Sequence, residues 1–277
     1  MKRIVTSLVL VGLLCMSMVV SIASAATETE VVFDTIPNPL PGNIISQGFQ
    51  ATSTDEIGDH ISVTGEARTL TSVTVTMSAW AKKSEYPDLT NPAGWDHPIT
   101  LNLYQVDNSG EDPALGALFS STTQTFLIPW RPEPDPTCPG GTAWRASNGT
   151  CFNGLAFNIV FNIANVELPD EFIYGVAYNT HTHGAVPIGT VGPWSSLNVG
   201  LTDSAPSVGT NVEPDAVFID TVSAFYTDNG AGGTDTFRRD TAWAGRSPTV
   251  QFTVTYELPT PDDMFDTLRS DTIAFVD

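Results

Sequence analysis

The stretch Ser72-Val73-Thr74-Val75-Thr76-Met77 alternates between polar and apolar side chains. Successive side chains of an extended chain point to opposite faces, so Val73, Val75 and Met77 would share one face. Valine and threonine are also favoured in strands, because their branched side chains pack well on a pleated surface. The stretch therefore predicts a β-strand with one buried face.

The same period of two recurs along the chain. Alternating strands are predicted at 99–104, 157–163, 196–201 and 249–256, and weaker ones at 61–64, 126–128 and 217–219. Residues 172–178 are apolar on both faces, which is typical of a central strand. No long stretch has the helical period of 3.6. The sequence therefore predicts an all-β fold: a β-sandwich with jelly-roll topology, or a barrel as the alternative.

The first 25 residues are typical of an export signal. Lys2 and Arg3 precede an apolar run over 4–20, and small residues follow at 21–25. We predict a helical signal peptide over 1–25, with an uncleaved membrane anchor as the alternative. The β-sandwich domain is expected over 26–258, followed by a linker and loose tail over 259–277. No second long apolar segment follows, which predicts a secreted, extracellular protein without a membrane span after cleavage, and association with the cell surface is a further possibility.

The charge balance excludes some partners. The 277 residues include 11 Lys and Arg against 31 Asp and Glu, which gives a formal net charge of −20. An acidic surface repels nucleic acids and anionic membranes, so neither is expected as the main partner. A hydrophobic content of 41% argues against general disorder.

Two cysteines, Cys138 and Cys151, remain once the signal peptide is removed. An even pair in an exported chain predicts one disulfide. A metal centre would need more ligands than these two thiols, and a catalytic cysteine would need a base nearby. No histidine lies close to either cysteine in the sequence.

Familiar catalytic motifs are missing from the sequence. There is no Gly-x-Ser-x-Gly elbow, no phosphate-binding glycine loop and no His-Glu-x-x-His zinc helix. We therefore predict no catalytic residue and do not favour an enzyme. A carbohydrate-active enzyme remains the alternative, and it would need two carboxylates in one cleft.

Two pairs of residues are candidate metal ligands. No cofactor is expected, and a structural calcium ion is the alternative. His181 and His183 would share one face if the preceding strand continued through them. Asp107 and Asp112 lie in an oxygen-rich turn of the kind that binds calcium, and 55–59 has a similar acidic composition. The alternative is a polar strand end for the histidines and a solvated turn for the acids.

Aromatic residues in the long connections are the candidate ligand contacts. Connections are expected at 80–98, 129–154 and 220–247, and loops of this length are often functional. Exposed aromatic rings are favoured at binding surfaces, including those for sugar rings. Alternatively, the loops fold back and use these rings as their own core. The candidates are Trp80, Tyr86, Trp95, Trp130, Trp144, Trp194 and Trp243.

Several stretches resemble secreted bacterial extracellular and cell-surface β-sandwich proteins that have varied C-terminal anchors and no assigned activity. The likeness is carried by 38–59, 68–80, 95–108, 128–161, 172–180 and 237–243, and it is most specific in the segment that holds both cysteines. The resemblance implies a secreted or surface domain and supports the disulfide. The hydrophobic C-terminal helix and sorting motif of anchored members are not found in this sequence, so no mode of attachment is implied.

These observations favour an exported, non-catalytic recognition or surface-associated module. A glycan or another envelope component is the expected partner, with the loop aromatics as contacts. A structural protein of an envelope or matrix is the alternative, and it would self-associate without binding a soluble ligand.

Overall fold

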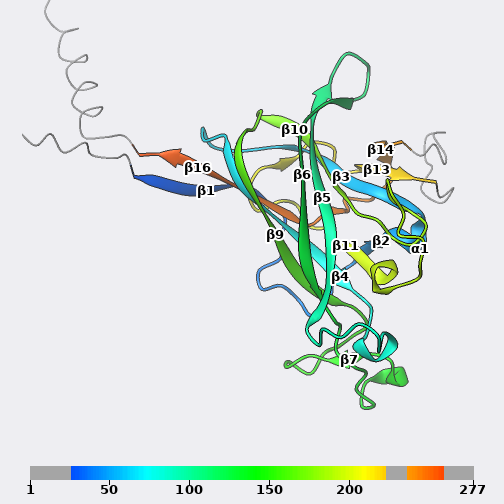
Figure 1. Ribbon diagram of the computed structural model, residues 1–277. Helices are drawn as coiled ribbons and strands as arrows, with labels where there is room; N and C mark the ends of the chain where they lie inside the picture. Colours follow the sequence, from blue (N-terminus) through cyan, green and yellow to red (C-terminus); the bar gives the residue numbers. More distant parts are fainter. Residues whose placement is uncertain (1–25, 223–235, 259–277) are drawn as a thin grey trace, which may run out of the picture. The chain divides into compact units, whose positions relative to one another are not determined.

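The computed structural model describes residues 26–222 and 236–258 (Figure 1). The expected signal peptide over 1–25, residues 223–235 of the expected 220–247 connection and the tail over 259–277 lie outside the described residues. Within the described ranges, no helix is long and apolar enough to cross a membrane. One compact unit runs from Glu28 to Tyr256.

The fold is an all-β sandwich, as predicted, and jelly-roll topology stays a prediction. One sheet contains β1 (Thr27–Asp34), β2 (Ser46–Gly48), β4 (Thr69–Ala79), β9 (Leu155–Glu167), β11 (Leu197–Thr202), β15 (Ser247–Pro248) and β16 (Val250–Glu257). The other contains β3 (Thr54–Ser62), β5 (Gly94–Asp107), β6 (Ala114–Pro129), β10 (Glu171–Ala177), β12 (Thr210–Asn211), β13 (Ala216–Thr221) and β14 (Arg238–Thr241). Short elements complete the described chain: α1 (Phe49–Thr52), η1 (Lys83–Glu85), η2 (Pro139–Gly141), η3 (Pro193–Ser196), β7 (Trp144–Arg145) and β8 (Cys151–Phe152).

Antiparallel pairing sets the order of both sheets. In the first sheet, which we call sheet A, β4 pairs with β9 along one edge and with β16 and then β11 along the other, and β2 lies beyond β11. In the second, sheet B, the order is β14-β13-β3-β10-β5-β6. The predicted central strand is β10, which lies between β3 and β5 and is buried from Phe172 to Val176.

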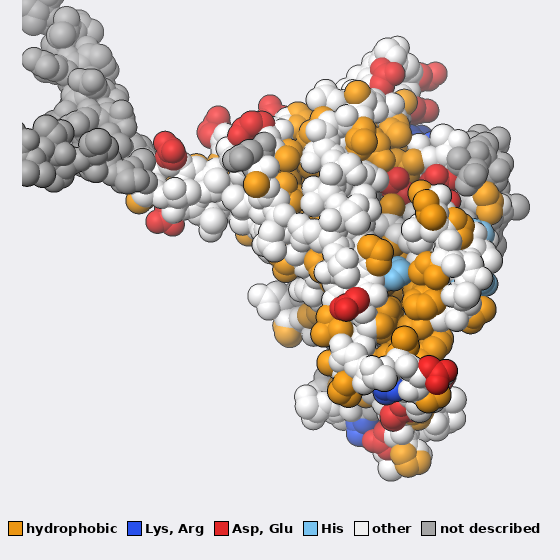
Figure 2. Space-filling view, in the orientation of Figure 1, with side chains coloured by type: hydrophobic (Ala, Val, Ile, Leu, Met, Phe, Trp, Pro, Cys, Tyr) orange, Lys and Arg blue, Asp and Glu red, His pale blue; other side chains and the backbone are white. Residues whose placement is uncertain are grey.

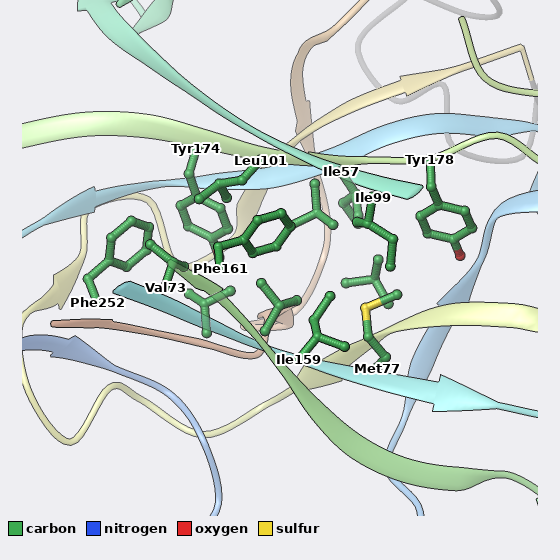
Figure 3. Packing of buried hydrophobic residues seen from close by; sticks show 14 of the residues in the cluster. Ile57, Val73, Met77, Ile99, Leu101, Ile159, Phe161, Tyr174, Tyr178 and Phe252 are labelled. Atoms are coloured by element: carbon green, nitrogen blue, oxygen red, sulfur yellow. The ribbon is translucent and has the colours of Figure 1, made fainter. Parts of the chain in front are cut away.

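The apolar positions of the alternating strands form the core between the two sheets. Val73, Val75 and Met77 of β4 are completely buried, as the alternation predicted. They face apolar side chains of sheet B such as Leu101 and Tyr174, as Figure 3 shows. Burying a side chain of this size contributes about 1.5–3 kcal/mol to folding, so this layer is the main source of stability.

The polar face of β4 is covered as well, which corrects the prediction of a single buried face. Thr76 and Ser78 are also completely buried. The segment between β1 and β2 crosses them, and the Oδ1 atom of Asn43 accepts a hydrogen bond from Ser78 Oγ at 2.7 Å. The carbonyl of Gly42 accepts from the backbone N–H of Ala156 at 3.0 Å, which fastens the same segment to β9.

A glutamine side chain joins the two sheets along one side of the sandwich. β6 and β9 are the outer strands of their sheets on this side. Gln124 of β6 donates from Nε2 to the carbonyl of Asn162 in β9 at 2.7 Å, and its Oε1 accepts from the N–H of Asn162 at 3.3 Å. The side-chain amide thus replaces a backbone peptide between the edges, since it offers the same donor and acceptor.

The predicted disulfide between Cys138 and Cys151 is confirmed, with the two Cα atoms 5.9 Å apart. It closes the small lobe of β7 and β8. Trp144 packs against Phe152 and donates its indole N–H to the carbonyl of Gly154 at 2.7 Å. A crosslink over a loop of this length stabilises by about 3 kcal/mol in the chain-entropy model, which suits a lobe with so small a core.

Candidate functional site

The predicted aromatic contacts differ widely in exposure. Trp80 has 38% of its surface exposed, and Tyr86 and Trp194 are half-buried. The remaining four expose at most 8%: Trp95, Trp130, Trp144 and Trp243. Packing alone accounts for Trp95, Trp130 and Trp144, whereas Trp243, although equally buried, also lines a hollow.

Several of these rings pack together beside the core. The ring of Trp130 lies 4.8 Å from that of Trp95 and 5.9 Å from that of Tyr86. The imidazole of His97 stacks on Trp194 at 6.5 Å. Trp95 and His97 belong to β5, which begins four residues before the expected end of the 80–98 connection. Burial lowers the pKa of His97 to about 4, so this imidazole is neutral at physiological pH.

The strongest candidate site is a hollow of about 380 Å³ that Trp243 lines. It lies on the side of the sandwich away from the Gln124 contact, where β2 of sheet A and β14 of sheet B border it. We call it the Trp243 hollow. Its lining residues are Ile45, Ser46, Gln47, Leu201, Asp240, Thr241, Ala242, Trp243, Ala244 and Arg246. Its volume is within the range of small-molecule sites.

A strained turn holds Trp243 in place. Ala242 and Ala244, on either side of it, have φ values of 66° and 53°, in the left-handed region that alanine rarely adopts. Such conformations cost about 1–3 kcal/mol each and persist only where their surroundings enforce them. Here the enforcing contacts are the Asp215 carboxylate, which accepts from the N–H of Ala244 at 2.9 Å, and Asp240 Oδ2, which accepts from the Trp243 indole at 2.8 Å.

The hollow combines apolar surface with fixed polar groups. Gln47 is buried, and its Nε2 donates to Thr52 Oγ1 at 2.6 Å and to Thr54 Oγ1 at 3.0 Å. Asp240 is buried, whereas Arg246 is exposed at the rim. A few oriented polar groups on an apolar lining are typical of sites for small polar ligands.

Two further hollows adjoin the same turn. One, of about 430 Å³, is lined mainly by 203–211 and includes Gly245 of the turn. The other, of about 220 Å³, shares Thr241 with the Trp243 hollow and is also lined by Glu213 and Arg239. Three hollows thus meet around the Trp243 turn.

A second cluster surrounds Glu56 on the outer face of sheet B. Its carboxylate crosses β10 above Gly175 and accepts hydrogen bonds from Asn102 Nδ2 at 2.9 Å and from the Tyr104 hydroxyl at 3.1 Å. Burial raises the pKa of Glu56 to about 7, the two hydrogen bonds oppose this, and the charge of Asp220 adds to it. A carboxyl group that titrates near neutrality next to a second one is a feature of acid–base sites.

We expect Glu56→Gln to stabilise the protein above pH 7. The pKa of Glu56 is about 7 in the folded state and 4.5 in its ordinary state, so the folded chain holds a proton that the unfolded chain has lost between these values. The stability from this group is complete below pH 4.5 and is lost as the pH rises through 7, by about 3 kcal/mol. Because glutamine does not titrate, the variant does not lose this stability. Urea unfolding of the variant and the wild type at pH 4.5 and pH 8 measures the difference in their free energies of unfolding.

The exposed Glu66→Gln is the matched control, and it should follow the wild type at both values. His97 acts in the opposite sense, because its lowered pKa makes stability rise with pH between about 4 and 6.5. In the wild type, the effects of Glu56 and His97 on the pH dependence of stability oppose each other. The stability of the Glu56→Gln variant should therefore rise with pH between about 4 and 6.5. A difference between variant and wild type that stays constant with pH would contradict the assignment.

Two other titratable groups of β3, Asp59 and His60, are also buried. Asp59 points to the core side, accepts from Asn211 Nδ2 at 2.7 Å, and has a pKa raised well above its usual range by burial. His60 is completely buried; its Nε2 is 2.6 Å from Glu171 Oε1 and its Nδ1 is 3.6 Å from Glu213 Oε2. These contacts hold strands of sheet B together.

The candidate metal ligands do not converge. β10 ends at Ala177, so the strand does not continue as expected and His181 and His183 do not share a strand face. The chain turns here, because the backbone N–H of Thr180 donates to the carbonyl of His183 at 2.8 Å. His181 Nδ1 contacts Ser195 Oγ at 3.0 Å.

The acidic turn has other partners. Asp107 Oδ1 accepts from the N–H of Ser109, and Asp112 lies 3.8 Å from Arg239. Among the described residues, no group of three or more His, Cys, Asp or Glu side chains is placed to hold a metal ion.

No protein-family model, curated protein or solved structure matches this chain. Sequence reasoning selected Trp243 as an aromatic residue in a long connection, but it missed Gln47, Asp240 and Arg246. No local signal marks these three, because the hollow exists only where β2 and β14 come together.

Proposed function

We propose that this protein is an exported, non-catalytic recognition module that binds a neutral glycan in the Trp243 hollow. The observation that carries the proposal is the turn at 242–244, in which two alanines keep left-handed backbone conformations around a tryptophan that lines a polar hollow. Strain of this kind concentrates at binding and active sites, where it fixes the geometry before the ligand arrives.

The chemistry of the lining supports a sugar. The part of the Trp243 indole that lines the hollow offers apolar surface for the C–H side of a sugar ring. Arg246 offers donors, and the side-chain oxygens of Gln47 and Asp240 offer acceptors, for its hydroxyl groups. The disulfide and the apolar start of the chain support an extracellular location, where such ligands occur.

The charge of the protein favours neutral glycans over acidic ones. With a net charge of −20, the protein repels polyanions at long range. Figure 2 shows a face on which hydrophobic side chains and uncharged groups cover most of the surface, with scattered acidic side chains and few basic ones. Hydrogen bonds and ring contacts, rather than ion pairs, are the interactions that such a surface offers.

A glycan array followed by calorimetry on the positive glycans tests the proposal. We expect saturable binding that Arg246→Ala weakens about tenfold, which corresponds to the loss of one hydrogen bond to a charged group. Arg246 is exposed, so this variant should fold normally. Trp243→Phe keeps a ring but removes the contact with Asp240, and it should also weaken binding.

Arg68→Ala is the matched control, because Arg68 pairs with Asp170 away from the hollow. It should bind like the wild type. Absence of any binding on the array, or binding that Arg246→Ala and Trp243→Phe leave unchanged, would overturn the proposal.

A further inference from the structure

The Trp243 hollow continues into a polar track that leads to Trp80. The strands β4, β11 and β2 are adjacent, with Ser78, Asn198 and Gly48 side by side in register. Ser78 is completely buried beneath Asn43, so the accessible row of side chains runs from Trp80 through Asn198 to Ser46. The side-chain amide of Asn198 is 3.0 Å from Ser46 Oγ and 3.2 Å from Trp80 Nε1. Ser46 in turn lines the hollow. One set of touching polar groups therefore connects the hollow with the most exposed tryptophan of the chain.

The distance between these points exceeds one sugar ring. Neighbouring strands lie about 4.8 Å apart, so the track from β4 across β11 to β2 measures about 10 Å before the hollow begins. Trp80 is 38% exposed at the far end, and Ile45 is 46% exposed at the near end. The track thus has apolar surface at both ends and hydroxyl and amide groups between them.

We infer that the site binds an extended chain of several sugar residues, with one in the Trp243 hollow and others along the track to Trp80. This inference rests on the proposed function and adds the ligand class: a neutral, linear polysaccharide, bound along its length, rather than a single terminal sugar. The side chains of the track, Trp80, Asn198 and Ser46, are uncharged, which suits a neutral chain.

Calorimetry with neutral β-linked glucan, xylan and chitin oligosaccharides tests the inference, each series running from the monosaccharide upward. We expect affinity to rise with length until the oligosaccharide spans the track, and then to level off. Trp80→Ala should lower the affinity for the longest oligosaccharides about tenfold and leave the monosaccharide within about twofold, because one ring contact is lost at the far end. Trp80→Phe, which keeps a ring, should restore most of the loss.

Tyr256→Ala is the matched control, since Tyr256 is an aromatic side chain of β16 with nearly the same exposure, 39%. Thermal melting of each variant shows that it is folded. Affinity that does not depend on length, or a Trp80→Ala effect equal at every length, would overturn the extended site while leaving the hollow itself supported. If no length of any series binds the wild type, the proposed function fails, and this inference fails with it.

Discussion

Gly58→Ala is expected to prevent stable folding. Gly58 is a residue of β3 that pairs with Gly175 of β10 on one side and Phe218 of β13 on the other. A Cβ atom at this position would lie 1.6 Å from the carbonyl oxygen of Tyr174 and 2.5 Å from its carbonyl carbon. Both are backbone atoms, so no side chain can rotate away, and the central pair of sheet B must separate. We expect a loss of more than about 4 kcal/mol, which is exceptional for one methyl group.

Urea unfolding measures this loss if the variant still folds. If the variant does not fold, circular dichroism shows the lost β-structure and proteolysis shows rapid cleavage. Gly110→Ala is the matched control: it lies in the turn between β5 and β6, and its Cβ would meet nothing closer than 3.5 Å. That variant should stay within about 0.5 kcal/mol of the wild type. A Gly58→Ala protein as stable as Gly110→Ala would show that β3 and β10 are farther apart than described.

Phe252→Ala is expected to have the second largest effect. Phe252 is completely buried and belongs to β16 of sheet A. Its ring lies 5.3 Å from that of Phe172 and 5.5 Å from that of Tyr174, both in β10 of sheet B, and 6.3 Å from that of Phe33 in β1. Removing it leaves a cavity between the sheets, at a cost of about 3–5 kcal/mol.

Chemical denaturation again measures this effect, with Tyr256→Ala as the control on the same strand. Tyr256 is 39% exposed, so its removal should change stability by about 0.5 kcal/mol at most. Phe252→Leu refills part of the space and should recover much of the loss. If Phe252→Ala cost no more than Tyr256→Ala, the two sheets would not meet at this ring.

The alternating strands were predictable because their pattern is local. Val73, Val75 and Met77 identify β4 by themselves, and the doubly apolar run at 172–178 identifies β10. β3 was largely missed because Glu56, Asp59 and His60 are charged or polar yet buried, through partners on other strands that only the fold supplies. Most of β6 was missed because serine and threonine occupy both of its faces, so the period of two disappears.

The site was predictable in part. Residue type and loop context selected Trp80 and Trp243, the two ends of the inferred chain-binding surface. Nothing in the sequence indicates the strain at Ala242 and Ala244, because glycine, and not alanine, is the residue expected in the left-handed region. The sequence does not single out Asn198 either, because it is one of several polar residues that alternate along β11.

The two sheets are joined on both sides of the sandwich. On one side, Gln124 connects β6 with β9. On the other side, α1 leads directly from β2 of sheet A into β3 of sheet B, and Gln47 of β2 donates to Thr54 of β3. The Trp243 hollow lies beside this second connection, so its two walls are held at a fixed spacing and a ligand must fit the width that the fold provides.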